Sequence, residues 1–365
     1  MTDNEFIPPV KLSNERTWAA LKDKVEDLVL GGRFVLGPEV GEFEAAAARM
    51  FGCKWAVGTS SGTSALWLAL RAAPLPRGSR VVLPANTFFA TFEAVVMAGH
   101  VPVVVDHDED YLIDLDALER VEAAAVIPVH LYGLPVDMDR LTSIARERGL
   151  WVLEDCSQAH GATSGGAPVG SIGNAGAFSA YPTKNLGAWG DAGYVTGSDP
   201  ELEVRIRALR HHGQEEGNVH LDVGSTERLD NIQALVLTEK LAHLHEEIDA
   251  RRRVAGWYRD GLADAGLDLP GDRPGRTHVY HQFVVRVPDR EAVRESLREQ
   301  GVGSMVHYPT PVHLQPGAKE WAEVPETPER SEAWAGSLLS LPLFTQMTEA
   351  QATRVVAALR GALGL

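Results

Sequence analysis

The sequence predicts an α/β fold in which a mostly parallel sheet lies between helices, and three observations support this prediction. Between about residues 50 and 200, short runs rich in β-branched residues alternate with stretches of helical periodicity. Two of these runs, VPVVV (101–105) and AAVIPV (124–129), are apolar almost throughout, as strands buried on both faces are. The chain is also long enough, at 365 residues with 44% apolar residues, to form two domains with cores of their own.

The expected strands and helices of the first domain follow one another in order. They are the strand WAVGT and the helix SALWLALRAA, VVLP and TFFATFEAVVMAG, VPVVV and LDALERV, AAVIPVH and DMDRLTSIARERG, and finally the strand WVLED. A Gly-rich stretch over 162–197 comes next, and residues 228–262 then carry apolar side chains at helical spacing.

A second, smaller α/β pattern closes the chain. It begins with HVYHQFVVRV (278–287), read as a strand, and ends with a helix over 348–363. We therefore expect a large domain over 1–245 and a small domain over 246–365, with the boundary inside the long helical segment.

Charge and cysteine content narrow the class of protein. The 34 basic and 50 acidic residues give a net charge of −16, which argues against nucleic acid or an anionic membrane as a partner. Cys53 and Cys156 are too few for a disulfide framework, and the N-terminus lacks the pattern of a signal peptide. No apolar run approaches the ~18 residues of a membrane span. We expect a soluble cytoplasmic protein.

One constellation lies where the strand WAVGT runs into the next helix, in VGTSSGTSALWLAL. Unpaired N–H groups at a helix start, hydroxyls at Ser61 and Thr63, and the missing Cβ of Gly62 together suit a phosphate group. The alternative is an ordinary capped helix, because Ser and Thr are favoured there anyway. The segment is neither a Walker loop nor a dinucleotide fingerprint, so an NAD site is unsupported.

Two further candidates are a carboxylate and an amine. The buried strand WVLED ends in Glu154 and Asp155, which alternate to opposite faces, at the sheet edge where α/β folds place ligands. Lys184, one of only seven lysines, lies between a strand-like run and a Gly-rich turn, where desolvation can free its amine as a nucleophile. Taken singly, the acids can be strand caps and the lysine a surface residue.

Together these three features meet the requirements of pyridoxal phosphate (PLP). Its aldehyde needs a Schiff-base lysine, its pyridine nitrogen needs an anion, and its phosphate needs an anchor. The motifs FVLGPEVGEFE, SSGTSAL, PANTFFAT, VHLYG, VLEDCSQAHGA, FSAYPTKNLGAWGDAG, RLDNIQA, HVYHQFVVR, VHYPTPVH and LSLPLF occur in this order over nearly the whole chain. In this combination the sequence resembles the DegT/StrS group of nucleotide-sugar aminotransferases, PLP enzymes of fold type I.

The resemblance implies roles for individual residues. Lys184 would form the Schiff base with the cofactor and Asp155 would pair with its pyridinium. Further cofactor-binding residues would be Gln158 beside the phenolic oxygen, Phe88 stacked on the ring, and Gly62, Thr63 and Ser179 at the phosphate. Members usually carry G-x-N-x-R before the long helix, and the Asn reaches the partner subunit's cofactor phosphate. Here Thr226 takes that place, which puts the contact between subunits in doubt.

The histidines offer a metal site only weakly. His278 and His281 would lie on opposite faces of the expected strand, so we expect no metal. Instead, Tyr280, His307, Tyr308 and His313 are candidates for lining the sugar-nucleotide cleft, with structural packing as the alternative for each.

The activity implied by the resemblance is a PLP-dependent transamination of a nucleotide-linked keto sugar with glutamate as amino donor. The stretch KNLGAWGDAG favours amination at C3 of a dTDP-3-keto-6-deoxyhexose over amination at C4. A sugar 3-dehydratase of the same fold uses His in place of the lysine, so Lys184 argues against it. A non-catalytic PLP-binding regulator is the remaining alternative. A homodimer with active sites at its interface is also implied.

Overall fold

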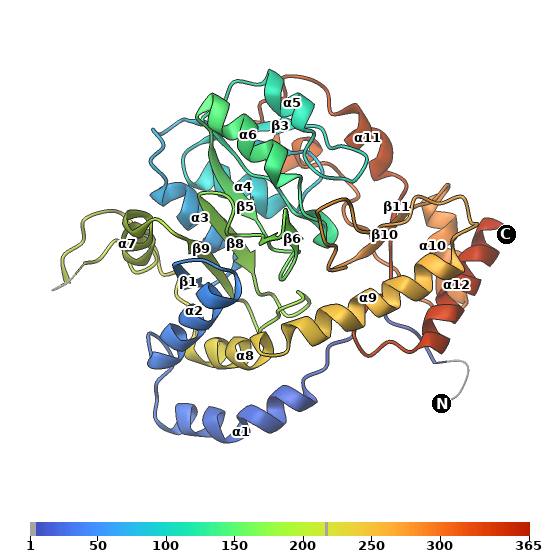
Figure 1. The fold of residues 1–365 in the computed structure, drawn as a ribbon, viewed down its shortest axis with the longest axis horizontal. Helices are drawn as coiled ribbons and strands as arrows, with labels where there is room; N and C mark the ends of the chain where they lie inside the picture. Colours follow the sequence, from blue (N-terminus) through green and yellow to red (C-terminus); the bar gives the residue numbers. More distant parts are fainter. Residues whose placement is uncertain (1–4, 216–217) are drawn as a thin grey trace.

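A seven-stranded sheet forms the centre of the larger part of the molecule (Figure 1). The computed structural model describes residues 5–215 and 218–365. The sheet has the order β1-β9-β8-β5-β4-β2-β3, and every neighbouring pair is parallel except the two that include β9. Its strands are β1 (Trp55–Thr59), β2 (Arg80–Pro84), β3 (Val101–Val105), β4 (Ala125–Val126), β5 (Trp151–Asp155), β8 (Ala175–Ser179) and β9 (Gly193–Gly197). The predicted α/β fold with a mostly parallel sheet is confirmed.

Alternation along β1 shows how the sheet divides two apolar cores. Trp55 and Val57 belong to the core that also contains the apolar side chains of α3 (Gly62–Ala72), whereas Ala56 belongs to the core beneath α2 (Pro38–Met50). Both faces of the sheet are therefore covered by helices, as a buried parallel sheet requires. The remaining helices of this part are α1 (Glu15–Leu30), α4 (Phe89–Met97), α5 (Leu115–Arg120), α6 (Met138–Arg148), α7 (Pro200–Leu209) and α8 (Asn231–Leu241).

Local capping fixes where the helices begin after their strands. The side chains of Ser61, Asp114 and Asp137 each accept a hydrogen bond from a backbone N–H in the first turn of the helix that follows. These caps set the helix N-termini close to the carboxyl edge of the sheet, the edge at which α/β folds place ligands.

The single long helix expected over 228–262 is two helices. α8 ends at Leu241 and α9 (Leu244–Gly261) begins three residues later. α8 packs on α1 and α2, whereas α9 packs on α12 (Glu349–Leu363). The break lies beside the expected domain boundary near residue 245, which stays a prediction.

The smaller part contains β10 (Phe283–Arg286) paired antiparallel with β11 (Leu338–Leu341), together with α10 (Arg290–Glu299). α11 (Glu329–Ala335) lies against the larger part, because the N–H groups of Arg330 and Ser331 donate to the Asp106 carboxylate. Ile7 also belongs to the core of the smaller part and bridges to Val302. The first described residues therefore pack on the C-terminal part, although the sequence assigned them to the large domain.

The strand expected over 278–287 forms only over Phe283–Arg286, so the expectation is confirmed for these residues and wrong for residues 278–282. The backbone N–H of His278 donates to the Asp272 carboxylate, and that of Val279 donates to the carbonyl of Gly133. Tyr280 adopts a positive φ of 46°. With these irregular partners, residues 278–282 form a connection that wraps against the large domain instead of extending the small sheet.

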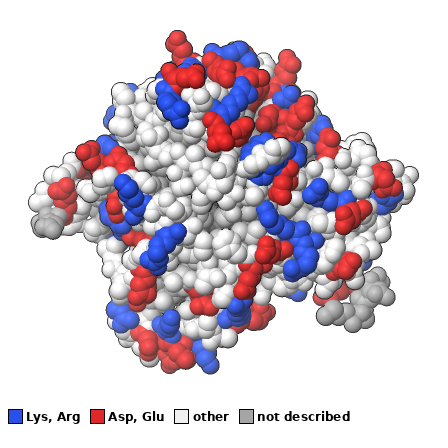
Figure 2. Space-filling view, viewed as in Figure 1, with Lys and Arg blue, Asp and Glu red and all other residues white. Residues whose placement is uncertain are grey.

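The surface matches the charge count. On the face shown in Figure 2, acidic and basic side chains are interspersed around the rim and much of the centre is uncharged. This face carries no basic stripe that could offset the net charge of −16 for nucleic acid binding. Within the described residues, every helix is too short or too polar to cross a bilayer.

Candidate active site

A cavity of about 520 Å³ opens at the carboxyl edge of the central sheet. It gathers side chains that are far apart in the sequence, from the ends of β5 and β8, the start of α3 and the segment that follows α10. Ten of the residues proposed from the sequence for the cofactor or the sugar cleft line it, namely Ser61, Gly62, Thr63, Phe88, Asp155, Gln158, Ser179, Lys184, His307 and Tyr308. The three constellations of the sequence therefore form one site.

Asp155 is the last residue of β5, and its carboxylate is buried and held from two sides. The Thr91 hydroxyl donates to Oδ2 at 2.9 Å, and the backbone N–H of Ser157 donates to Oδ1 at 3.1 Å. The Thr87 hydroxyl lies 2.9 Å from that of Thr91 and extends the chain of hydrogen bonds. These partners orient the carboxylate in the cavity wall before any ligand binds.

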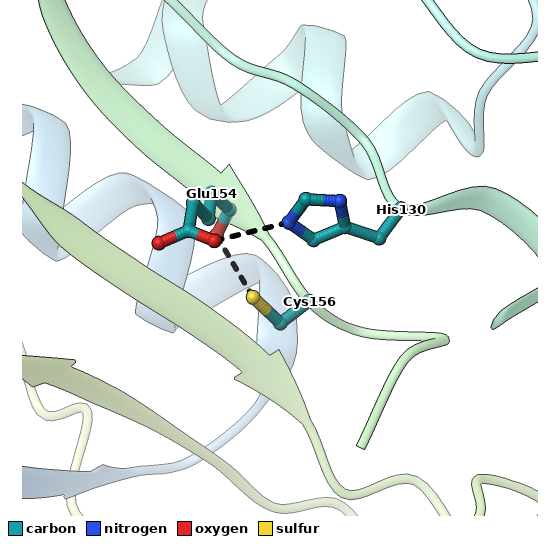
Figure 3. Close-up of side chains that lie close together, drawn as sticks. All are labelled: His130, Glu154 and Cys156. Atoms are coloured by element: carbon teal, nitrogen blue, oxygen red, sulfur yellow. Dashed lines mark hydrogen bonds and ion pairs between the residues drawn. The ribbon is translucent and has the colours of Figure 1, made fainter. Parts of the chain in front are cut away.

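The neighbouring Glu154 does not line the cavity, as alternation along the strand predicts. Its side chain lies beside those of His130 and Cys156 (Figure 3). Its carboxylate accepts backbone N–H groups of Gly170, Ile172 and Gly173 at 2.7–2.9 Å and lies 3.1 Å from Nε2 of His130. Glu154 thus ties the loop after β7 (Ala167–Pro168) to the end of β5, and has a structural part rather than a place in the cavity.

His130, Glu154 and Cys156 bring three possible metal ligands within 4.8 Å of one another (Figure 3). However, Nδ1 of His130 accepts the backbone N–H of Val136, so the ring proton lies on Nε2 and is donated to Glu154. The thiol of Cys156 points to the Glu154 carbonyl at 3.7 Å. With both imidazole nitrogens engaged, this cluster is a hydrogen-bond network, and the donor set does not suit a metal.

Lys184 lies in the cavity wall, just beyond the end of β8. Desolvation by the surrounding protein lowers the pKa of its amine to about 8, although the nearby Asp155 opposes the shift. Roughly a tenth of the amine is therefore unprotonated at pH 7, far more than in an exposed lysine. The predicted nucleophile has the electrostatic surroundings that its chemistry needs.

Three histidines lie in the electrostatic reach of Lys184. Burial is the main cause that lowers the pKa of His160 to about 3, that of His307 to about 4 and that of His281 well below its usual value, and Lys184 adds to each shift. These rings stay neutral at pH 7, so they do not add positive charge beside the amine. The sequence considered His281 only as a metal ligand and did not single out His160.

The part of the cavity at the start of α3 suits an anion. Ser61 caps α3 and accepts from the N–H of Ser64, which leaves the first N–H groups of the helix, at Gly62 and Thr63, without intrahelical partners. A Cβ on Gly62 would lie only 2.4 Å from Cβ of Ser179. Glycine is therefore required for the helix to come this close to β8. The positive end of the helix dipole can stabilise a phosphate here, so no lysine is needed beside it.

The cavity fits PLP at three separate points. Lys184 offers a desolvated amine, Asp155 offers an oriented carboxylate, and the α3 N-terminus offers unpaired N–H groups, all within one cavity. This fit rests on two side chains and on backbone N–H groups of the chain itself. The role of each cofactor residue remains a prediction.

Gln158 and Phe88 occupy positions consistent with their expected roles. The amide of Gln158 is fixed, since Oε1 accepts the N–H of Tyr132 at 2.7 Å and Nε2 donates to the Tyr308 hydroxyl at 3.1 Å. Phe88 is 56% exposed, an unusual position for a large apolar ring, and lies 5.7 Å from the ring of Tyr308. Its face is available to a flat ligand.

Three residues predicted for the site lie outside this cavity. Tyr280 is buried in the core of the small part and stacks on His278 at 4.1 Å, so the structure favours the packing alternative. His313 pairs with Glu332. Thr226 lines a separate cavity with Arg228, and its hydroxyl lies 2.9 Å from Nε2 of His212 in the same chain. Its approach to a second subunit's phosphate stays a prediction.

Comparison with known proteins gives a consistent result. The model of the DegT/DnrJ/EryC1/StrS aminotransferase family matches residues 17–360. The chain is 40% identical to a UDP-N-acetyl-3-dehydro-alpha-D-glucosamine 3-aminotransferase of Acidithiobacillus ferrooxidans over 100% of both chains. It is 39% identical to a dTDP-3-amino-3,4,6-trideoxy-alpha-D-glucose transaminase of Streptomyces venezuelae, covering 96% of this chain and 94% of that one. A crystal structure of S. venezuelae DesV in complex with a ketimine intermediate has a TM-score of 0.92 at 38% identity, with 98% of both chains covered.

Proposed function

Because the chain belongs to the DegT/DnrJ/EryC1/StrS family of PLP-dependent aminotransferases, we propose that it aminates C3 of a nucleotide-linked 3-keto-6-deoxyhexose, with L-glutamate as amino donor. The nucleotide in this proposal is dTDP. The observation that carries the proposal is the meeting of Lys184, Asp155 and the α3 N-terminus in one cavity.

Bound PLP supplies the electron sink through which an amino group is moved. The chain's own part in proton transfer falls to Nζ of Lys184. With a pKa near 8, this amine is free base in part of the molecules at neutral pH and can both take up and return a proton. Because burial lowers the pKa of His281 and His307 well below 7, these rings are much weaker bases than Lys184, which is the group best suited to take up that proton.

Asp155 and the helix start orient the reactants. The Asp155 carboxylate, fixed by Thr91 and Ser157, provides the negative charge that stabilises a protonated pyridine ring. The N–H groups at Gly62 and Thr63 hold the phosphate at the other end. An anchor at each end fixes the cofactor relative to Lys184 and so removes the need to reorganise during the reaction.

The names of the relatives support amination at C3 of the sugar, whereas the nucleotide differs from one name to the other. The A. ferrooxidans relative is named for a 3-dehydro sugar and 3-amination, and the S. venezuelae relative is named for a 3-amino sugar. The first name carries UDP and the second dTDP. The dTDP assignment therefore depends on the motif resemblance and needs a direct test.

Assembly and location complete the proposal. We propose a homodimer whose active sites lie at the interface, which the exposed apolar side chains Phe34, Val35 and Leu36 support. A cytoplasmic location fits the two free cysteines.

The test compares three keto sugars. The PLP-loaded protein is incubated with L-glutamate and a dTDP-3-keto-6-deoxyhexose, a UDP-linked 3-keto sugar or a dTDP-4-keto-6-deoxyhexose, and products are identified by mass spectrometry and NMR. We expect nitrogen on C3 and preference for the dTDP sugar. Faster amination at C4 would replace the proposal by the 4-aminotransferase alternative, and no product from any sugar would favour a PLP-binding regulator.

A further inference from the structure

Arg251, on α9, is a buried cation without an anionic partner. The residue is only 8% exposed, and no carboxylate of the described residues lies within 4.0 Å of its guanidinium. Nη1 donates to the carbonyls of Tyr280 and His281 at 3.3 Å each, whereas the buried Nε has no hydrogen-bond partner in the described chain. Glu247, one turn earlier on α9, acts on the guanidinium electrostatically but forms no ion pair with it. A buried charge normally has a directly bonded charged partner, so this arrangement favours an anion from outside the chain.

Two small cavities give such an anion room. Arg251 lines a cavity of about 70 Å³ together with Thr183, His281 and His307. It also lines a second one of about 180 Å³ together with Lys184. Thr183, His281 and His307 line the large active-site cavity as well, so the first cavity is next to the active site and has room for a small group.

The surroundings of Arg251 favour negative charge. The 180 Å³ cavity is lined by further cations, and Glu247 is its only acidic residue. These cations are Lys11, Arg16, Lys184 and Lys240. Burial lowers the pKa of Arg251 to about 10, which still leaves the guanidinium charged at pH 7. The two carbonyl contacts are long for charged hydrogen bonds, so a structural role alone leaves the guanidinium poorly satisfied.

We propose that Arg251 binds a carboxylate of the amino donor, entering from the active-site cavity past Thr183 and His281. The inference rests on the proposed function, since it takes the donor to be an amino acid such as glutamate. A guanidinium suits this task because it presents several N–H donors in a plane that matches a carboxylate. The hexose of the proposed acceptor carries no carboxylate, so donor and acceptor should respond differently to a change at Arg251.

The experiment uses the PLP-loaded protein and separates binding from turnover. Glutarate, which has the carboxylates of glutamate but no amine, is titrated calorimetrically into wild type and Arg251→Gln. We expect the variant to bind glutarate at least about 30-fold more weakly, as loss of a charge-assisted contact implies. In single-turnover reactions, the glutamate concentration that gives half the maximal rate should rise by a similar factor in the variant. Binding of the nucleotide sugar should change less than threefold.

Control variants separate ligand binding from folding. Arg253→Gln removes an exposed guanidinium from the same helix and should leave glutarate affinity unchanged. Arg251→Lys retains the charge and should recover part of the affinity, and thermal unfolding of each variant reports stability. Equal glutarate affinity in Arg251→Gln and wild type overturns the inference. If the wild type aminates no keto sugar, the proposed function fails, but the glutarate titration still decides whether Arg251 binds a carboxylate.

Discussion

At Lys184, desolvation sets the pH at which the amine can react. Its pKa is about 8, whereas an exposed lysine titrates near 10.5. Only the free base attacks an aldehyde, so covalent attachment of PLP to the apoprotein should accelerate as pH rises, with a midpoint near 8 and a plateau above it. Stopped-flow absorbance measures this. A midpoint near 10 would mean that the amine is solvated.

Chemical reduction identifies the lysine directly. Borohydride should fix the cofactor to the peptide that contains Lys184, and Lys184→Ala should still bind PLP noncovalently but lose multiple-turnover transamination. Lys240, whose Nζ already donates to Asn14 and to the Gly187 carbonyl, serves as the control position. Peptide mass spectrometry that found the adduct on Lys54 or Lys240 would show that the assignment is wrong.

Asp155→Asn tests the anion of the site. An amide keeps the shape and can still contact Thr91, but it cannot offset the charge of a pyridinium. Loss of one preorganised electrostatic partner costs roughly 2–4 kcal/mol at the transition state, about 10²–10³ in rate. We expect this loss in the steady-state rate with the fold and most cofactor binding retained, as circular dichroism and absorbance report. A rate within twofold of wild type would contradict the role of Asp155.

The site residues that could be predicted from the sequence were those marked by their immediate sequence neighbours. Asp155 ends an apolar strand, and Lys184 is a rare lysine in a Gly-rich segment, so both stand out in the sequence. Thr91 and His281 did not, because their importance comes from contacts across 64 residues in one case and from the fold of residues 278–282 in the other. Arg251 looked like any basic residue on an amphipathic helix, and only its burial sets it apart.

At the scale of elements, the start of α3 makes the most specific prediction. A Cβ on Gly62 would lie 2.4 Å from Cβ of Ser179, so Gly62→Ala must displace the helix start from β8. Overpacking of this kind costs about 1–3 kcal/mol in stability, and we expect PLP affinity to fall at least about tenfold. Thermal unfolding and equilibrium dialysis of the cofactor measure the two effects.

Gly256 provides the matched control for this substitution. It lies within α9, and a Cβ there meets nothing within 4 Å. Gly256→Ala should therefore leave PLP affinity unchanged and stabilise the fold by about 0.5–1 kcal/mol, since alanine is the better helix former. Equal PLP affinity in both variants would remove the α3 start from the phosphate site.

The order of strands and helices could be predicted because the spacing of apolar residues within a short segment already distinguishes a helix from a buried strand. The expected strand does not reach back to His278 because the nearby Asp272 accepts the N–H of His278, and the distant Gly133 carbonyl accepts that of Val279. The long helix divided at Ala242 because its two halves pack on different partners. Tertiary partners override local propensity in both cases.

At the scale of the whole molecule, the apolar side chains left exposed predict a second subunit. Phe34, Val35 and Leu36 are each at least 44% exposed and adjacent in sequence, a cluster that a monomer would not ordinarily leave in water. Val35 also lines the cavity that contains Thr226 and Arg228, so an interface there would place these residues near a partner.

We expect light scattering to give twice the chain mass. Val35→Glu should weaken the dimer at least about tenfold and lower PLP retention with it, whereas Leu365→Glu, at the exposed C-terminus, should change neither. A monomeric wild type that retains full transaminase activity would show that each site is complete within one chain.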